Sequence, residues 1–398
     1  MATTNTLTDS SPTPALAGGG LLVVLPALHH EQYQSLFANL VASMPAEELL
    51  IAAPEGIQTD QYPALRFVSL PSTRSAWTLT AADFTSAYQI AEKNHARAIL
   101  MLGPECDSLD PSGLRELAHA VVAASVDLAV SYYDLPPRAG LVNSSILYPL
   151  SRALFATRVR FPLAIDLGLS LRMAEQLAAA ATRLVANNQG DAPIWPGGEA
   201  ALAGMTIEEV DVGGRRFPQP AEMDLNTILP LVTGSLFSDI ESKAALWQRA
   251  RTTPPSRRRI PANVVSPSDA NAEIASMIQG FRLGYTNLLE IWGLVLPPNS
   301  LLGLKRLSQL DGAAFKMPEQ LWAHIVFDFL VAYRLRSINR GHLLGALIPL
   351  YLAWVAGHIN VVASGVNPER HVEAVAAAFE ADKPYLVARW RWPDRFNP

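Results

Sequence analysis

Short apolar runs alternate with segments of helical periodicity through the first third of this chain. A continuous apolar run of four to eight residues is typical of a strand that is buried on both faces of a parallel sheet. Intervening segments of helical spacing then supply the crossover connections, so the pattern predicts an α/β fold. The runs are LLVVLPA at 21–27, ELLIAAPEG at 48–56, LRFVSLP at 65–71, RAILMLGPE at 97–105 and VDLAVSYY at 126–133.

Beyond residue 269 the sequence is nearly all helical in pattern. Residues 250–269, ARTTPPSRRRIPANVVSPSD, combine proline with like charges, and both oppose compact structure. We therefore predict a linker there. The expected organisation is a disordered leader at 1–19, an α/β domain at 20–249, the linker at 250–269 and a mainly helical domain at 270–398.

Charge and cysteine content exclude several classes of protein. The 31 Lys and Arg against 36 Asp and Glu give a net charge of −5, which does not fit a nucleic-acid binder. One cysteine, Cys106, cannot form an internal disulfide, so we expect a cytoplasmic protein. The apolar stretch at 343–365 is interrupted by Pro349, His358 and Asn360, which favours a buried core helix over a transmembrane one. The apolar helical tail suits a dimer interface as well as a core, so the sequence does not decide between a monomer and a homo-oligomer.

The segment DLAVSYYDLPPRAGLVNSSILYPLSRALFATRVRFPLAIDLGLSLRMA, at 127–174, resembles a stretch of the bacterial mannosylglycerate and glucosyl-3-phosphoglycerate synthases. The segments WAHIVFDFLVAYR, LLGALIPLYLAWVA and FEADKPYLVARW are similar to the helical tail of those glycosyltransferases. The resemblance implies a GT-A domain that binds a UDP- or GDP-sugar and transfers its hexose to a small, acidic or hydroxylated acceptor. It also implies Mg²⁺ or Mn²⁺ as a cofactor and a retaining reaction.

The metal-binding positions of that family are largely replaced here. Where the family has Asp-X-Asp after the central strand, this chain has Gly103, Pro104 and Glu105, and the family's later histidine falls on Phe217. A phenyl ring cannot bind a metal, and one carboxylate makes a poor Mg²⁺ site. Glu105 is thus a weak metal candidate, with Asp107 as a stand-in partner, or a solvated loop acid.

The donor side departs from the family pattern as well. Glu55 is the nearest carboxylate to the family's early Asp, and Pro26 closes the first strand at the ligand edge. The loop at 77–80 lacks the family's glycines and lysine. Arg215 and Arg216 could offset the charge of a diphosphate without a metal, or they could belong to a solvated basic hairpin. Trp292, Trp322 and Trp354 are better read as core of the helical domain than as a sugar-stacking platform. The adjacent histidines His29 and His30 do not have the spacing of a metal-binding pair.

The acceptor side carries the candidate catalytic carboxylate. By the resemblance, Asp166 corresponds to the acidic position beside the transferred sugar; its alternatives are a helix cap near Ser170 or a buried partner of Arg152 or Arg160. A second set, Arg138, Asn143 and Ser144, resembles the acceptor-binding region, and a planar guanidinium suits a carboxylate or phosphate. The other interpretation is a solvated loop arginine and a turn asparagine.

Two functions follow from these patterns. The first is a hexosyltransferase with weak or no dependence on a divalent metal. The second is a catalytically inactive GT-A relative that acts as a binding or interaction scaffold, because the replacements fall on the site while the flanking scaffold matches.

Overall fold

The first half of the protein is built on one mixed sheet of seven strands. The computed structural model describes residues 20–55, 57, 59–71, 77–123, 126–217, 224–249 and 270–393. The strand order is β3-β2-β1-β4-β6-β5-β7, and β6 runs antiparallel to both of its neighbours. The strands are β1 (Leu21–Val24), β2 (Leu49–Pro54), β3 (Arg66–Leu70), β4 (Ala98–Met101), β5 (Leu128–Asp134), β6 (Leu167–Ser170) and β7 (Ile207–Gly214).

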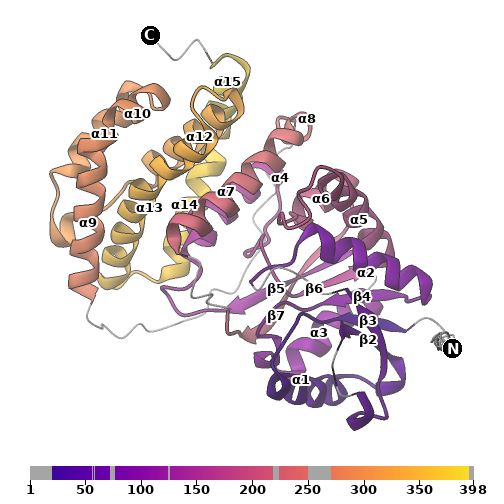
Figure 1. The fold of residues 1–398 in the computed structure, drawn as a ribbon. Helices are drawn as coiled ribbons and strands as arrows, with labels where there is room; N and C mark the ends of the chain where they lie inside the picture. Colours follow the sequence, from indigo (N-terminus) through magenta and orange to yellow (C-terminus); the bar gives the residue numbers. More distant parts are fainter. Residues whose placement is uncertain are drawn as a thin grey trace, which may run out of the picture.

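Helices cover both faces of this sheet, as Figure 1 shows, with α1 and α3 on one face and α2 and α5 on the other. All four residues of β1 and of β4 are buried, as expected for central parallel strands. The predicted α/β class is therefore confirmed. The helices of this half are α1 (His30–Ser43), α2 (Ala81–Lys93), α3 (Pro111–Val122), α4 (Tyr148–Phe155), α5 (Leu171–Ala186) and α6 (Pro196–Ala203).

The second half is an assembly of helices around its own apolar core. Trp292, Trp322 and Trp354 are at most 1% exposed there, which confirms their predicted core position. The helices are α7 (Leu225–Ser242), α8 (Ala244–Trp247), α9 (Ala270–Asn287), α10 (Leu289–Val295), α11 (Pro298–Ser308), α12 (Glu319–Leu335), α13 (Arg340–Ala363), α14 (Pro368–Ala381) and α15 (Lys383–Arg391).

The helical core begins earlier in the chain than the predicted boundary. Helix α7 packs against α12 and α13, and helix α4 packs against α14 (Figure 1). Residues of α4 and α7 therefore belong to the core of the helical half. An amphipathic helix buries its apolar face against whichever partner offers apolar surface. The predicted leader (1–19) and linker (250–269) lie outside the described residues.

Helix α13 is long and apolar enough to cross a membrane by length and composition. In this fold 67% of its most apolar window is buried inside the protein. It packs against α7, α9 and α12, in the position expected of the core helix that the sequence predicts.

Candidate functional site

A buried ion pair between Asp166 and Arg215 lies at the carboxyl edge of the sheet. Both side chains are 0% exposed, and Nε of Arg215 lies 2.8 Å from Oδ2 of Asp166. Oδ1 of Asp166 also accepts a hydrogen bond from the backbone N–H of Gly103, and Oδ2 accepts one from the hydroxyl of Tyr133, both at 3.0 Å. The carboxylate therefore joins the ends of β4, β5, β6 and β7.

Glycine is required at position 103 for this arrangement. A Cβ atom there would lie 2.7 Å from Cβ of Ile165 and 2.9 Å from its carbonyl oxygen. These separations are shorter than van der Waals contact, so only glycine lets the end of β4 approach the residue before Asp166.

The predicted roles of Asp166 and Arg215 are corrected by this geometry. Asp166 has no exposed atom with which to meet a sugar, and it neither caps α5 nor pairs with Arg152 or Arg160. The cap of α5 is Ser170, whose hydroxyl accepts a hydrogen bond from N–H of Met173. Arg215 also donates hydrogen bonds to the carbonyls of Pro104 (2.7 Å) and Arg216 (2.6 Å), so it is not free for a diphosphate. Both are positioning residues.

The neighbours of this pair are held in their neutral forms. Burial, and then the negative charge of Asp166, raise the pKa of the Tyr133 phenol well above its usual value. The same two causes raise the pKa of the Cys106 thiol. Cys106 therefore stays a thiol and is no nucleophile at neutral pH.

The loop after β4 gathers two carboxylates around Arg216. The guanidinium of Arg216 lies 2.5 Å from Oδ2 of Asp107 and 3.6 Å from Oε2 of Glu105. The amide of Gln32 donates to the same two carboxylates, each at 3.2 Å. Glu105 has a φ of 62°, a left-handed conformation that few non-glycine residues adopt. The turn thus brings Glu105 and Asp107 together on one cation, the exposed Arg216.

This loop does not fit the divalent metal that the family resemblance implies. Mg²⁺ and Mn²⁺ need a near-octahedral set of oxygen ligands. Here the place of a cation between Glu105 and Asp107 is taken by a guanidinium, and the next residue is Phe217, whose ring packs edge-on against Tyr133. No group of three or more metal-ligating side chains occurs within the described ranges.

The other donor-side candidates lie apart from this loop. Glu55, in the turn after β2, accepts a hydrogen bond from the hydroxyl of Ser69 at 3.3 Å. The carbonyl of Pro26 accepts one from the hydroxyl of Tyr33 at 2.9 Å. Pro26 and Pro104 line a small cavity at this edge, with a volume of about 10 Å³, together with Thr78 and Leu79. Such a volume holds about one water molecule.

Two of the acceptor-side candidates, Asn143 and Ser144, are hydrogen-bonded to Arg160. The amide of Asn143 donates to the carbonyl of Arg160 at 2.8 Å, and the hydroxyl of Ser144 accepts from its guanidinium at 2.9 Å. Both belong to a π-helical turn, η4 (Asn143–Leu147), just before α4. Arg138 lies apart, half exposed, in an ion pair with Glu273 of α9 at 3.1 Å.

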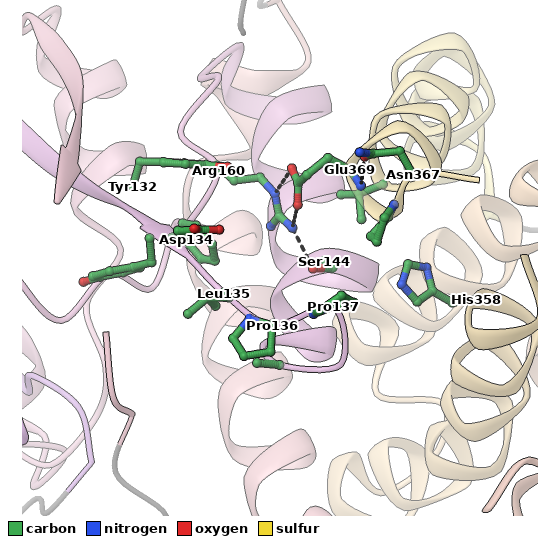
Figure 2. A pocket seen from close by; sticks show the side chains of 15 residues that line it. Tyr132, Asp134, Leu135, Pro136, Pro137, Ser144, Arg160, His358, Asn367 and Glu369 are labelled. Carbon is green, nitrogen blue, oxygen red and sulfur yellow. Dashed lines mark hydrogen bonds and ion pairs between the residues drawn. The ribbon is translucent and has the colours of Figure 1, made fainter. Parts of the chain in front are cut away.

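Arg160 lines a small cavity between the sheet half and the helical half. Its guanidinium pairs with both oxygens of Glu369 on α14, at 3.0 and 2.9 Å. Figure 2 shows this pair beside Ser144, with His358 of α13 on the opposite side of the cavity. The cavity has a volume of about 40 Å³, and its wall also includes the end of β5, the loop that follows it and the start of α14.

Two histidines connect this cavity to the surface of the helical half. Nδ1 of His358 lies 2.7 Å from Nδ1 of His371, and Nε2 of His371 lies 3.6 Å from a carboxylate oxygen of Glu319. Two facing ring nitrogens share one hydrogen, so one imidazole must donate and the other accept. Which of the two rings donates is set by their tautomers.

Sequence reasoning missed several of these residues. Gln32, Tyr133, Glu369 and His371 were not identified as candidates, and His358 was noted only as an interruption of an apolar stretch. The signal for Glu369 was present, because Glu369, Glu373 and Glu380 place three carboxylates along α14, where Glu373 and Glu380 pair with Arg152. The histidines lie on different helices, so only the tertiary structure brings them together.

Comparison with known proteins gives solved structures only. No family model and no curated protein matches this sequence. Similar structures include glucosyl-3-phosphoglycerate synthase from Mycobacterium tuberculosis in complex with phosphoglyceric acid, at 16% identity, with 56% of this chain and 80% of that chain covered and a TM-score of 0.36. The same synthase with Mn²⁺, UDP-glucose and phosphoglyceric acid matches at 16% identity, covering 57% and 81%, with a TM-score of 0.37. A mycobacterial protein matches at 15%, covering 58% and 76%, with a TM-score of 0.38. The synthase is of the family that the sequence segments resemble, but superpositions this loose carry no conclusion about function.

Replacing Asp166 with Asn should destabilise the fold strongly. The change leaves the buried guanidinium of Arg215 without its counter-charge, and breaking a buried pair costs about 3–5 kcal/mol. Arg216→Ala is the comparison variant, because the guanidinium that it removes is 62% exposed and its loss should cost less than the change at Asp166. Urea unfolding measures both. An Asp166→Asn variant as stable as the wild type would contradict the positioning role.

His358 should stay neutral down to about pH 4. Burial, then the charges of His371 and Arg160, lower its pKa to about 3. The unfolded chain protonates this residue near pH 6.5, so the stabilisation is complete above that pH and is lost as the pH falls toward 3. Nitrogen-15 NMR of the imidazoles reports the charge and tautomer directly. A His358 ring that titrates near pH 6 would refute the buried arrangement.

Proposed function

We propose that this protein binds a nucleotide-diphospho-sugar at the carboxyl edge of its sheet and transfers the hexose to a small acceptor without a divalent metal. The observation that carries the proposal is Arg216. Its side chain is 62% exposed and stands between Glu105 and Asp107, where the resembling enzymes hold a cation. Whether the donor carries UDP or GDP, and whether the anomeric configuration is retained, are parts of the same proposal.

The chemistry asks for a positive charge at this edge. A nucleoside diphosphate develops negative charge as the glycosidic bond breaks, and a fixed cation beside it lowers the barrier. A guanidinium can meet two phosphate oxygens with two parallel N–H donors. The Arg216 side chain is 62% exposed, so a phosphate can reach its guanidinium from solvent, while Asp107, whose side chain is 9% exposed, keeps its hydrogen bond from Gln32.

The charge balance sets a limit on this binding. One guanidinium offsets only one of the two carboxylates of Glu105 and Asp107, whereas a divalent cation would offset both. The remaining negative charge repels a diphosphate. Metal-free binding at this loop should therefore be weak, and it should become stronger when a carboxylate is neutralised.

Two substitutions at the loop separate this proposal from a metal-dependent enzyme. Calorimetric titration with UDP-glucose and GDP-mannose, each with Mn²⁺ and again with EDTA, should give the same affinity in both conditions. Arg216→Ala should weaken binding roughly tenfold or more, the scale of a charge-assisted hydrogen bond. Asp107→Asn should strengthen binding, although the same change in a metal site would abolish it.

The inactive scaffold is the second candidate, and a specific observation favours it. Asp166, the carboxylate expected beside the sugar, is sealed inside the fold, and the cavity at the donor edge is only about 10 Å³ in volume. In that case neither nucleotide-sugar binds under any condition. Loss of binding in EDTA, or in Asp107→Asn, would instead show a metal-dependent site.

A further inference from the structure

A larger cleft lies on a different side of the molecule. It has a volume of about 440 Å³, within the range of small-molecule sites, which often form where two parts of a chain meet. Helix α7 forms one wall, and Figure 1 shows this helix between the sheet half and the other helices. The opposite wall is the end of α5 with the segment that leads into α6. The cleft shares no lining residue with the loop of Glu105 and Arg216.

A row of hydroxyl groups lines the α7 wall. Ser235, Ser238 and Ser242 are spaced three and four residues apart, so they share one face of the helix. Ser238 lies 2.9 Å from the hydroxyl of Tyr333, and Ser235 accepts a hydrogen bond from the indole of Trp195 at 3.1 Å. The hydroxyl of Ser235 also donates to the carbonyl of Pro193 at 3.2 Å, and that of Ser242 donates to the carbonyl of Asp239 at 2.8 Å. These serines therefore offer acceptor lone pairs to a ligand.

The charges around the cleft balance. Below its surface, Nζ of Lys243 lies 2.8 Å from Glu199 and also contacts Asp239. At the rim, Arg340 pairs with Glu241 at 2.7 Å. With Arg183, the described side chains that line the cleft or pair with its lining are three cations and three carboxylates. A neutral ligand fits such a site better than an anion or a cation.

The aromatic residues here do not offer open faces. Trp195 is 3% exposed, and the guanidinium of Arg340 lies 3.9 Å from the ring centroid of Tyr333. Ring stacking is therefore not available to a ligand. Hydrogen bonds to hydroxyls must carry the recognition, with apolar contacts from residues such as Leu184 and Leu344.

We propose that this cleft binds a neutral saccharide, held through the serine hydroxyls of α7. A sugar is neutral and rich in hydroxyl groups, and its C–H faces match the apolar lining. The site is separate from the proposed donor edge and does not depend on nucleotide binding there.

The test uses the full-length protein and defined sugars. Maltose and α-1,2-mannobiose are titrated by calorimetry and by saturation-transfer NMR, up to the millimolar concentrations at which sugars bind weak sites. At least one of the two should bind saturably. Ser238→Trp fills the cleft and should weaken that binding tenfold or more. Ser276→Trp places the same side chain on an exposed position of α9, away from the cleft, and should leave binding unchanged.

The other outcomes overturn the proposal. Absence of saturable binding by both sugars removes the saccharide site, and binding that Ser238→Trp does not affect places the sugar elsewhere. A parallel titration with UDP-glucose separates this site from the donor edge. If Ser238→Trp abolishes UDP-glucose binding while Arg216→Ala does not, the cleft is a nucleotide-sugar site and the separate saccharide site is refuted.

Discussion

The pairing of Asp166 with Arg215 holds the functional edge of the sheet together. Four strand ends converge on one carboxylate, which accepts hydrogen bonds from Gly103, Tyr133 and Arg215. A charge buried this deeply is tolerated only when it is paired and fully hydrogen-bonded. Because Arg215 points inward, its neighbour Arg216 extends outward to the loop carboxylates. One buried pair thus sets the position of the exposed cation on which the proposed function depends.

A second set of ion pairs joins the two halves of the protein. Glu369, Glu373 and Glu380 of α14 meet Arg160 and Arg152 of the sheet half, and these two guanidinium groups are at least 92% buried. The hydroxyl of Tyr148 adds a hydrogen bond to Glu373 at 2.6 Å. The guanidinium groups of Arg152 and Arg160 are therefore neutralised by carboxylates of the helical half.

The sequence predicted the α/β class and the positions of β1 to β5, because apolar runs such as those of β1 and β4 identify buried strands without knowledge of their partners. The strands β6 and β7 were not predicted. Contacts between side chains that are distant in the sequence could not be predicted. Asp166 was identified as a candidate carboxylate, but its partner lies 49 residues away. The alternation of side chains along β7 could not predict which of Arg215 and Arg216 points into the protein. Val210 and Val212 of β7 are buried, so continued alternation would point the side chain of residue 216 into the protein. Because β7 ends at Gly214, the alternation stops there, and the side chain of Arg215 is the buried one. The pairing of β5 with β7 is also irregular between Tyr132 and Asp134.

The central claim is that a guanidinium occupies the place of the metal between Glu105 and Asp107. Titration of the wild-type protein with Mn²⁺, followed by paramagnetic broadening of its amide NMR signals, tests that claim most directly. The account predicts no selective broadening at the loop around Cys106 and at Gln32 in wild type, and its appearance after Arg216→Ala, which leaves the two carboxylates uncompensated. Selective broadening of those signals in wild type at micromolar Mn²⁺ would contradict it.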